Sequence, residues 1–192
     1  MKRAEIPTIK VPLLDLKAQY GRIQSEVRHA LDEVLDSQAF ILGPTVQQFE
    51  EQVASYLQCR AAVGVASGSD ALLLSLMALG IGKGDGVLVP TFTFFSSVAC
   101  MTRLGATPIF VDIDPDTCLI DTKQTEDLLG QRSRKSNGRI KAILPVHLFG
   151  QCCAMDELLS IANRYNLKIV EDVAQALGSK NALSKGGPKA AG

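Results

Sequence analysis

Short apolar segments alternate with predicted helices over residues 61–173, and this alternation constrains the fold more than any other feature of the sequence. The strand candidates are the apolar runs at residues 61–66, 86–90, 108–113, 140–146 and 167–173. The predicted helices between them are at residues 70–79, 95–104, 122–129 and 155–165. Because strands and helices alternate, the pattern predicts an α/β fold of parallel β-α-β units with helices on both faces of the sheet.

Two amphipathic helices are predicted before this region, at about residues 22–35 and 45–57. We expect Thr45 to be the N-cap of the second helix, because Gln48 follows it at capping-box spacing. The domain boundaries that we expect are an N-terminal helical segment at residues 1–58, the main domain at 59–178 and a loop at 179–192. This last segment is rich in Gly, Lys and Ala and has no periodicity.

Composition and charge exclude several classes of protein. The 192 residues are 46% hydrophobic and 21% charged, which is ordinary globular usage. Twenty Lys and Arg residues balance twenty Asp and Glu residues without a basic stripe, which argues against a nucleic-acid-binding protein. There is no apolar run of membrane-spanning length, no secretion signal and no CxxC spacing among the five Cys residues. We therefore expect a cytoplasmic protein with reduced thiols and no membrane partner.

The strongest local motif is Ser67-Gly68-Ser69-Asp70, where a predicted strand ends and a helix begins. The unpaired N–H groups of a helix start and the positive end of its dipole form an anion site that suits phosphate. The Ser69 hydroxyl could add a donor to this site. Taken alone, the motif is more often explained by Ser67 or Ser69 acting only as an N-cap.

Acidic residues follow two of the predicted strands. Asp112 and Asp114 lie on one face by strand alternation, so they could bind a divalent metal with a nucleotide. The run from Asp114 to Thr117 is also ordinary turn sequence, and we favour that interpretation. At the last strand, alternation sends Glu171 and Asp172 to opposite sides, so only one of them need face a site.

A carboxylate at the end of a parallel strand is costly unless a positive group meets it or water solvates it. A pyridinium nitrogen is one such positive group, and Gln175 could then reach a neighbouring phenolic oxygen. A solvated strand end is equally consistent with these residues.

Seven motifs occur in an order that resembles one family of enzymes, the fold-type I, pyridoxal-phosphate-dependent sugar aminotransferases of the DegT/StrS kind. The motifs are Pro12-Leu13-Leu14-Asp15-Leu16, Phe40-Ile41-Leu42-Gly43-Pro44, Ser67-Gly68-Ser69-Asp70-Ala71-Leu72, Pro90-Thr91-Phe92-Thr93-Phe94, the segment from Gly105 to Asp114, Pro145-Val146-His147-Leu148-Phe149-Gly150-Gln151 and Glu171-Asp172-Val173-Ala174-Gln175-Ala176. No single motif is decisive, but the ordered set is specific.

The resemblance implies six cofactor-binding residues: Gly68, Ser69, Asp70 through its backbone N–H, Phe94, Asp172 and Gln175. The first three would hold the phosphate, and Phe94 would stack on the pyridine ring. Asp172 would pair with the protonated ring nitrogen and keep the cofactor an electron sink, while Gln175 would bond to the phenolic oxygen. The chain departs from the family at Ser69, Val173 and Leu177, where Thr, Ala and His are usual.

The resemblance also implies a three-layer αβα large domain that is incomplete at the C-terminus. The family's Schiff-base lysine lies in a Ser-Phe-x-x-x-Lys segment that this sequence does not contain. Lys180, Lys185 and Lys189 match a variable loop instead, so we assign no catalytic residue and no metal ligand. The strands that would neighbour residues 61–66 in this fold are also absent from the sequence.

The activity implied by the resemblance is transfer of an amino group, with glutamate as donor, to a nucleotide-linked keto-sugar. The sugar would enter cell-surface polysaccharides or secondary metabolites, and the full-length parent would be a homodimer. We expect the 192-residue chain to be inactive alone, because it lacks the lysine segment. The alternatives are a non-catalytic partner of a full-length paralogue and a metal-dependent nucleotide-sugar glycosyltransferase centred on Asp112 and Asp114.

Overall fold

The computed structural model describes residues 11–133 and 139–180. The chain divides into two compact units, Met1–Phe49 and Glu50–Gly192. Helix α1, Leu16–Ser37, lies in the first unit. Its N-cap is Asp15, whose Oδ1 accepts the N–H of Ala18 at 3.0 Å. Helix α2, Pro44–Leu57, begins in the first unit and continues into the second. Among the described helices, none combines the length and hydropathy that a membrane span requires.

The expected N-cap of α2 is wrong. The helix begins at Pro44, so Thr45 is already inside its first turn. The carbonyl of Gly43 accepts the N–H groups of Val46 and Gln47, at 3.0 and 3.3 Å. Proline is favoured at the first helical position because its φ is preset and its missing N–H would have no partner there.

The second unit contains a four-stranded sheet of parallel strands in the order β2-β1-β3-β4. The strands are β1 (Asp85–Pro90), β2 (Thr107–Val111), β3 (Arg139–Ile143) and β4 (Lys168–Ile169). The helices that alternate with them are α3 (Gly68–Ala78), α4 (Ser96–Arg103), α5 (Thr122–Ser133) and α6 (Met155–Tyr165), with a short 3₁₀ turn, η1, at Leu148–Gly150. The predicted parallel α/β fold is confirmed.

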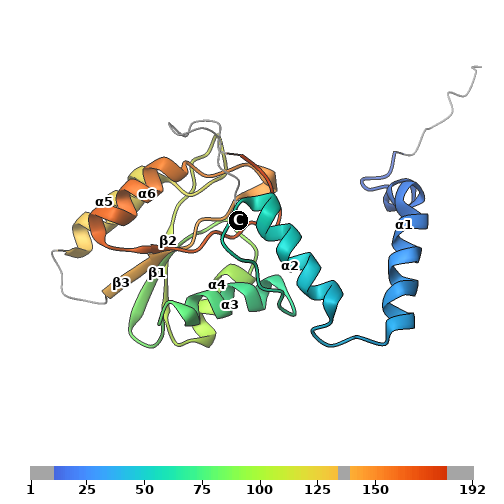
Figure 1. Ribbon diagram of the computed structural model, residues 1–192. Helices are drawn as coiled ribbons and strands as arrows, with labels where there is room; N and C mark the ends of the chain where they lie inside the picture. Colours follow the sequence, from blue (N-terminus) through green and yellow to red (C-terminus); the bar gives the residue numbers. More distant parts are fainter. Residues whose placement is uncertain (1–10, 134–138, 181–192) are drawn as a thin grey trace, which may run out of the picture. The chain divides into compact units, whose positions relative to one another are not determined.

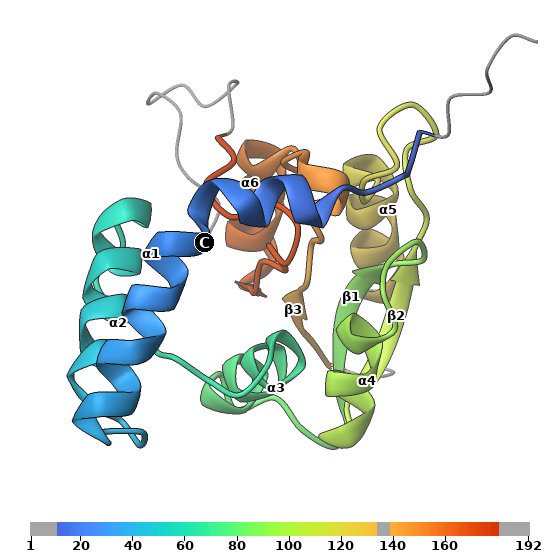
Figure 2. The same ribbon diagram turned by 90° about the vertical axis from the view of Figure 1, so that its right-hand side faces the viewer.

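Helices cover both faces of this sheet, with α3 and α4 on one face and α5 and α6 on the other (Figures 1 and 2). The strand β1 shows why, because its side chains alternate between two separate cores. Leu88 packs in one core with Leu158 of α6, whereas Val87 and Val89 pack in the other with Leu76 of α3. Alternate side chains of a strand point to opposite faces, so a continuous apolar strand needs a helical layer on each side. These layers form the three-layer αβα architecture.

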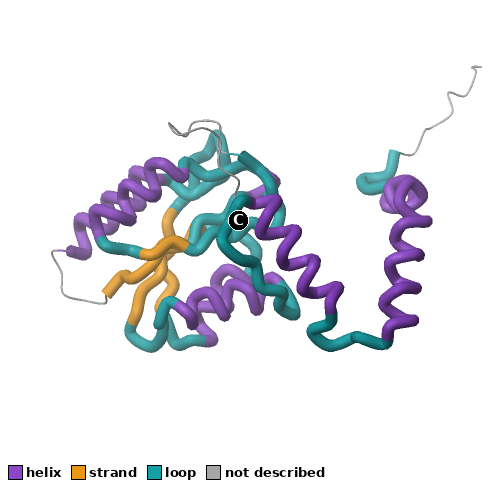
Figure 3. Tube along the Cα trace, viewed as in Figure 1, coloured by secondary structure: helices purple, strands orange, loops and turns teal. Residues whose placement is uncertain are grey.

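The strand expected at residues 61–66 is wrong. The segment between α2 and α3 is loop (Figure 3), and Val63 and Val65 within it are exposed. The N–H of Gly64 donates to a side-chain oxygen, Oε1 of Glu50, at 2.6 Å. None of the described strands pairs with this segment, and an extended segment without a neighbouring strand has no ladder to join.

The last two predicted strands are longer than the strands β3 and β4, yet parallel pairing continues beyond them. The N–H of Val170 donates to the carbonyl of Ile143 at 3.1 Å, and Asp172 forms an isolated parallel bridge with Val146. Between these contacts lies Pro145, which has no N–H and interrupts the ladder. The pairing therefore carries the chain in register as far as Asp172.

An ion pair between β1 and β3 gives a first testable prediction. Nζ of Lys141 lies 2.9 Å from Oδ2 of Asp85, whose side chain is 14% exposed, and the N–H of Gly82 donates to the same oxygen. The hydrogen bond from Lys141, with that from Gly82, lowers the pKa of Asp85. Stability from a lowered carboxyl pKa is complete above the unfolded-state pKa and is lost as pH falls through the folded-state pKa.

We therefore expect Asp85→Asn to lower the free energy of unfolding by about 1–2 kcal/mol at pH 7. The variant should also lose less stability than the wild type below about pH 4. Urea unfolding at pH 7 and pH 3 measures both effects. The exposed Asp116 is the control, and an equal effect of Asp116→Asn would show that net charge rather than this ion pair is responsible.

Candidate functional site

The carboxyl ends of the strands meet the starts of two helices at one edge of the sheet. Strand β1 ends at Pro90 and leads to the start of α4 at Ser96, and β4 leads to Asp172. Helix α3 precedes β1 and packs beside α4, so both helices begin at this edge. In open α/β sheets, ligands bind outside the carboxyl ends of the strands. This edge is therefore the candidate site.

Asp172 is a buried carboxylate that neutral groups hold in place. The residue is 9% exposed. Its Oδ2 accepts a hydrogen bond from the hydroxyl of Ser97 at 2.8 Å. Its Oδ1 accepts the N–H of Ala174 at 3.2 Å. Among the residues that the structure describes, no Lys, Arg or His forms an ion pair with Asp172. A buried carboxylate without a cation is costly, so this one is suited to a positively charged ligand group.

Ser69 and the start of α3 lie beside the start of α4. The hydroxyls of Ser69 and Ser96 are 2.7 Å apart. Because Ser97 follows Ser96 and bonds to Asp172, the dipeptide connects the residue predicted to bind phosphate with the residue predicted to bind the ring nitrogen. The structure thus brings Ser69 and Asp172 to the same site.

The other two predicted phosphate-binding residues have different surroundings. The N–H of Asp70 donates to Oγ of Ser67 at 3.1 Å, so the N-cap interpretation of Ser67 is confirmed. This bond occupies the Asp70 N–H that the family resemblance assigns to phosphate. Beyond its chain neighbours and its own helix backbone, a Cβ at Gly68 would meet no described atom within 4 Å, so the backbone there is open to an approaching group. The amides of Gly68 and Ser69 are the first two of the helix, which have no partner within it.

Phe94 and Gln175 reach the edge from two further segments. The carbonyl of Phe94 accepts the N–H of Ser97 in the turn that begins α4, and the Phe94 residue is 75% exposed. Oε1 of Gln175 accepts the N–H of Phe149 at 2.9 Å. Phe149 also contacts Phe92 edge to face, with ring centroids 6.3 Å apart. The ring of Phe94 is therefore available to a ligand, while Gln175 is held by η1.

The carboxylate next to Asp172 has a structural partner instead. Nδ1 of the buried His147 accepts the N–H of Cys153 at 2.9 Å, so the ring proton is on Nε2 and is donated to Oε2 of Glu171, also at 2.9 Å. Burial raises the pKa of the Cys153 thiol to about 12, so this thiol stays protonated at neutral pH. Of the two carboxylates, Asp172 is the one that belongs to the candidate site.

Asp114 makes the bonds of a turn. Its Oδ1 accepts the N–H groups of Asp116 and Thr117 and the hydroxyl of Thr117, at 2.9–3.1 Å. These bonds lower the pKa of Asp114. Oδ1 of Asp112 accepts its neighbour's N–H and, at 3.4 Å, the hydroxyl of Thr91. The turn interpretation accounts for Asp114, and no group of three or more potential metal ligands occurs in the described part of the chain.

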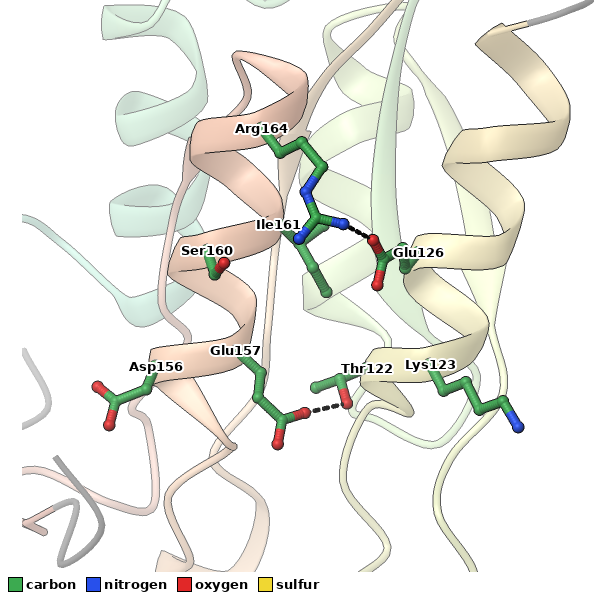
Figure 4. A pocket seen from close by; sticks show the side chains of 8 residues that line it. All are labelled: Thr122, Lys123, Glu126, Asp156, Glu157, Ser160, Ile161 and Arg164. Atoms are coloured by element: carbon green, nitrogen blue, oxygen red, sulfur yellow. Dashed lines mark hydrogen bonds and ion pairs between the residues drawn. The ribbon is translucent and has the colours of Figure 1, made fainter. Parts of the chain in front are cut away.

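A hollow of about 440 Å³ lies elsewhere, between α5 and α6 (Figure 4). Charged residues from both helices line it, and they bond to one another across it. Arg164 pairs with Glu126, and the hydroxyl of Thr122 donates to Glu157 at 2.5 Å. None of the residues predicted for the site lines this hollow.

Three residues of the site were missed by reasoning from the sequence. Ser97 is fully buried and bonds to Asp172, Ser96 bonds to Ser69, and Thr93 lies 3.0 Å from the hydroxyl of Ser97. In the sequence, the feature that could have indicated them is a pair of serines at the start of a helix that follows a strand. Such serines are common as helix caps, so the sequence alone gives them no chemical role.

The comparisons with known proteins agree with the ordered motifs. The model of the DegT/DnrJ/EryC1/StrS aminotransferase family matches residues 21–190. The chain belongs to this family. It is 42% identical over 90% of its length to the pleiotropic regulatory protein of Geobacillus stearothermophilus, and 44% identical over 93% to the dTDP-3-amino-3,4,6-trideoxy-alpha-D-glucose transaminase of Streptomyces venezuelae.

The fold also matches solved structures, among them a DegT DnrJ EryC1 StrS aminotransferase from Brucella abortus, at a TM-score of 0.85 and 37% identity over 88% of this chain and 45% of that one. The chain matches NtdA from Bacillus subtilis, solved with its cofactor PMP bound, at a TM-score of 0.81 and 34% identity over 96% of this chain and 40% of that one. Against the two sequence relatives, it covers 44% and 45% of their lengths. The chain therefore spans less than half the length of these relatives.

Proposed function

We propose that the protein carrying this chain is a cytoplasmic, pyridoxal-phosphate-dependent aminotransferase that moves an amino group from glutamate to a nucleotide-linked keto-sugar. The observation that carries this proposal is the buried Asp172, which lies at the carboxyl edge of a parallel sheet without a cationic partner among the described residues. Family membership supports the reaction class, and the activity named for the Streptomyces venezuelae relative supports the substrate class.

The residues at the edge of the sheet fit this cofactor. When bound, pyridoxal phosphate supplies an electron sink that makes the amino-bearing carbon of the donor acidic. Asp172 would hold the ring nitrogen in its protonated form, because a desolvated carboxylate stabilises a positive charge beside it. NtdA, which shares the fold, binds PMP, the amino form of the same cofactor.

The start of α3 would hold the phosphate. The amides of Gly68 and Ser69 are at the positive end of the helix, and Gly68 leaves the backbone open to close approach. The Ser69 hydroxyl can donate to phosphate while it accepts from Ser96. The exposed ring of Phe94 would cover the pyridine ring, and Gln175 would bond to the phenolic oxygen.

The 192-residue chain by itself would bind the cofactor without turning over substrate. None of its lysines lies in a Ser-Phe-x-x-x-Lys segment, and transamination needs a lysine both to carry the cofactor and to move the proton. Amino transfer by the purified chain would contradict this part of the proposal. Copurification with a longer paralogue would instead support the partner-subunit alternative.

Titration of the purified chain with pyridoxal phosphate and with pyridoxal tests the proposed phosphate site. We expect saturable binding of pyridoxal phosphate and at least about tenfold weaker binding of pyridoxal, because hydrogen bonds to charged groups contribute about 1.5–3 kcal/mol. Ser69→Ala should weaken pyridoxal phosphate several-fold and leave pyridoxal unchanged, while Ser75→Ala in the same helix should change neither. Equal affinities for the two ligands would mean that the start of α3 does not bind the phosphate. The absence of saturable binding would contradict the proposal.

A further inference from the structure

We propose that Ser97 is a positioning residue, which acts through Asp172 to hold that carboxylate aimed at the ring nitrogen of the cofactor. This inference rests on the proposed function, because it concerns the same site. Ser97 is the second residue of α4 and is fully buried, and its hydroxyl donates to Oδ2 of Asp172 at 2.8 Å. The bond joins residues that are 75 positions apart in the sequence.

The direction of the hydrogen bonds favours the negative charge. Ser97 has one hydroxyl proton, which goes to Asp172, so the Thr93 hydroxyl must donate to Ser97 across the 3.0 Å between their oxygens. The donors thus point in series from Thr93 to Ser97 to Asp172. Because Ser97 and Asp172 are buried, such a series strengthens each bond and stabilises the carboxylate as an acceptor.

The same bonds fix the orientation of the carboxylate. One oxygen of Asp172 is held by Ser97 from α4, and the other accepts the N–H of Ala174 from the segment after β4. Two neutral donors on different segments restrict rotation of the group without neutralising its charge. Each oxygen keeps acceptor capacity that a ligand cation can use.

The first turn of α4 also connects this carboxylate with the start of α3. Ser96, the neighbour of Ser97, bonds to Ser69 at 2.7 Å, so the first turn of α4 contacts both predicted ends of the cofactor site. A shift of α4 would move the partner of Asp172 and the partner of Ser69 together. The first turn of α4 therefore sets the spacing between the group that meets the ring nitrogen and the group that meets the phosphate.

The test compares two ligands that differ only at the ring nitrogen. Pyridoxal phosphate and its 1-deaza analogue, which has C–H in place of the nitrogen, are titrated against the 192-residue chain, and the ratio of their affinities is measured. We expect the wild type to prefer pyridoxal phosphate at least about tenfold. Ser97→Ala should remove most of this preference by weakening only pyridoxal phosphate, and Ser97→Thr should restore it.

Two further variants complete the test. Thr102→Ala removes an exposed hydroxyl from the same helix and should leave both affinities unchanged. Thr93→Val removes the outer donor of the series and should lower the preference about threefold, which keeps the inference testable if Ser97→Ala does not fold. Circular dichroism checks the fold of each variant.

The outcomes separate the two proposals. A wild type that binds both ligands equally contradicts the pairing of Asp172 with the ring nitrogen, and the inference about Ser97 fails with it. A wild type that prefers pyridoxal phosphate supports that pairing. If Ser97→Ala or Thr93→Val then keeps the full preference, or weakens both ligands alike, the role of these hydroxyls is overturned while the proposed function stands.

Discussion

Under the proposed function, Asp172→Asn is expected to lower the rate of amino transfer by about 10²- to 4 × 10³-fold. The carboxylate is proposed to meet the protonated ring nitrogen of the cofactor at a site where its residue is only 9% exposed. Asparagine keeps the size and can accept the Ser97 hydroxyl, but it cannot balance a positive charge. Removing one partner of a buried charge pair costs about 3–5 kcal/mol, and each 1.4 kcal/mol is a factor of ten in rate.

The measurement is kcat/KM for the glutamate half of the reaction, with Glu171→Gln as the matched control. Glu171 is the adjacent carboxylate, and glutamine retains an oxygen that can accept the Nε2 proton of His147. We expect the control to lose less than about tenfold, because its charge faces a histidine rather than the cofactor. Equal losses in the two variants would contradict a specific role for Asp172.

The same variant has an opposite expectation for the stability of the cofactor-free chain. Asp172 has hydrogen bonds from Ser97 and Ala174 but no cation among the described residues, so only neutral donors balance its buried charge. Asp172→Asn removes that charge but turns a donor NH2 toward the Ala174 N–H, so the two effects oppose each other and the urea midpoint should change little. A large loss of stability would mean that Asp172 serves folding and that any loss of activity is indirect.

Local patterns predicted most of the second unit because each one has a local cause. The alternation of apolar runs and helices gave the order of the elements, and α6 begins and ends at the predicted residues, Met155 and Tyr165. The prediction of a strand at residues 61–66 was wrong because a strand needs a partner strand, and an apolar run does not reveal whether one is present. The predicted N-cap of α2 was wrong because Pro44 takes the first helical position, next to the capping residue.

The candidate site was predictable only in part. Reasoning from residue types indicated the helix start at Ser69 and the strand end at Asp172, while the resemblance to a family supplied a role for each. Ser97 could not be found in this way, because its importance comes from a contact with a residue 75 positions away. Contacts of this kind depend on which helix begins beside which strand, and one sequence does not contain that information locally.

Leu158→Ala is expected to have the largest effect on stability, lowering the free energy of unfolding by about 3–4 kcal/mol. Leu158 is 0% exposed in α6 and belongs to the core between α5, α6 and the sheet. Truncation removes buried methyl and methylene groups and leaves a cavity, and both effects destabilise the folded state. Because α6 contacts β4, this core also supports the strand that leads to Asp172.

The adjacent Leu159 provides the control, because it has the same side chain in the same helix but is 43% exposed. Leu159→Ala makes the same change in helix propensity, so the difference between the two variants isolates burial. We expect Leu159→Ala to cost less than about 1 kcal/mol in urea unfolding. If the two variants lose equal stability, α6 is not packed on the sheet as the structure has it. A loss confined to Leu158 supports the position of α6 independently of any cofactor.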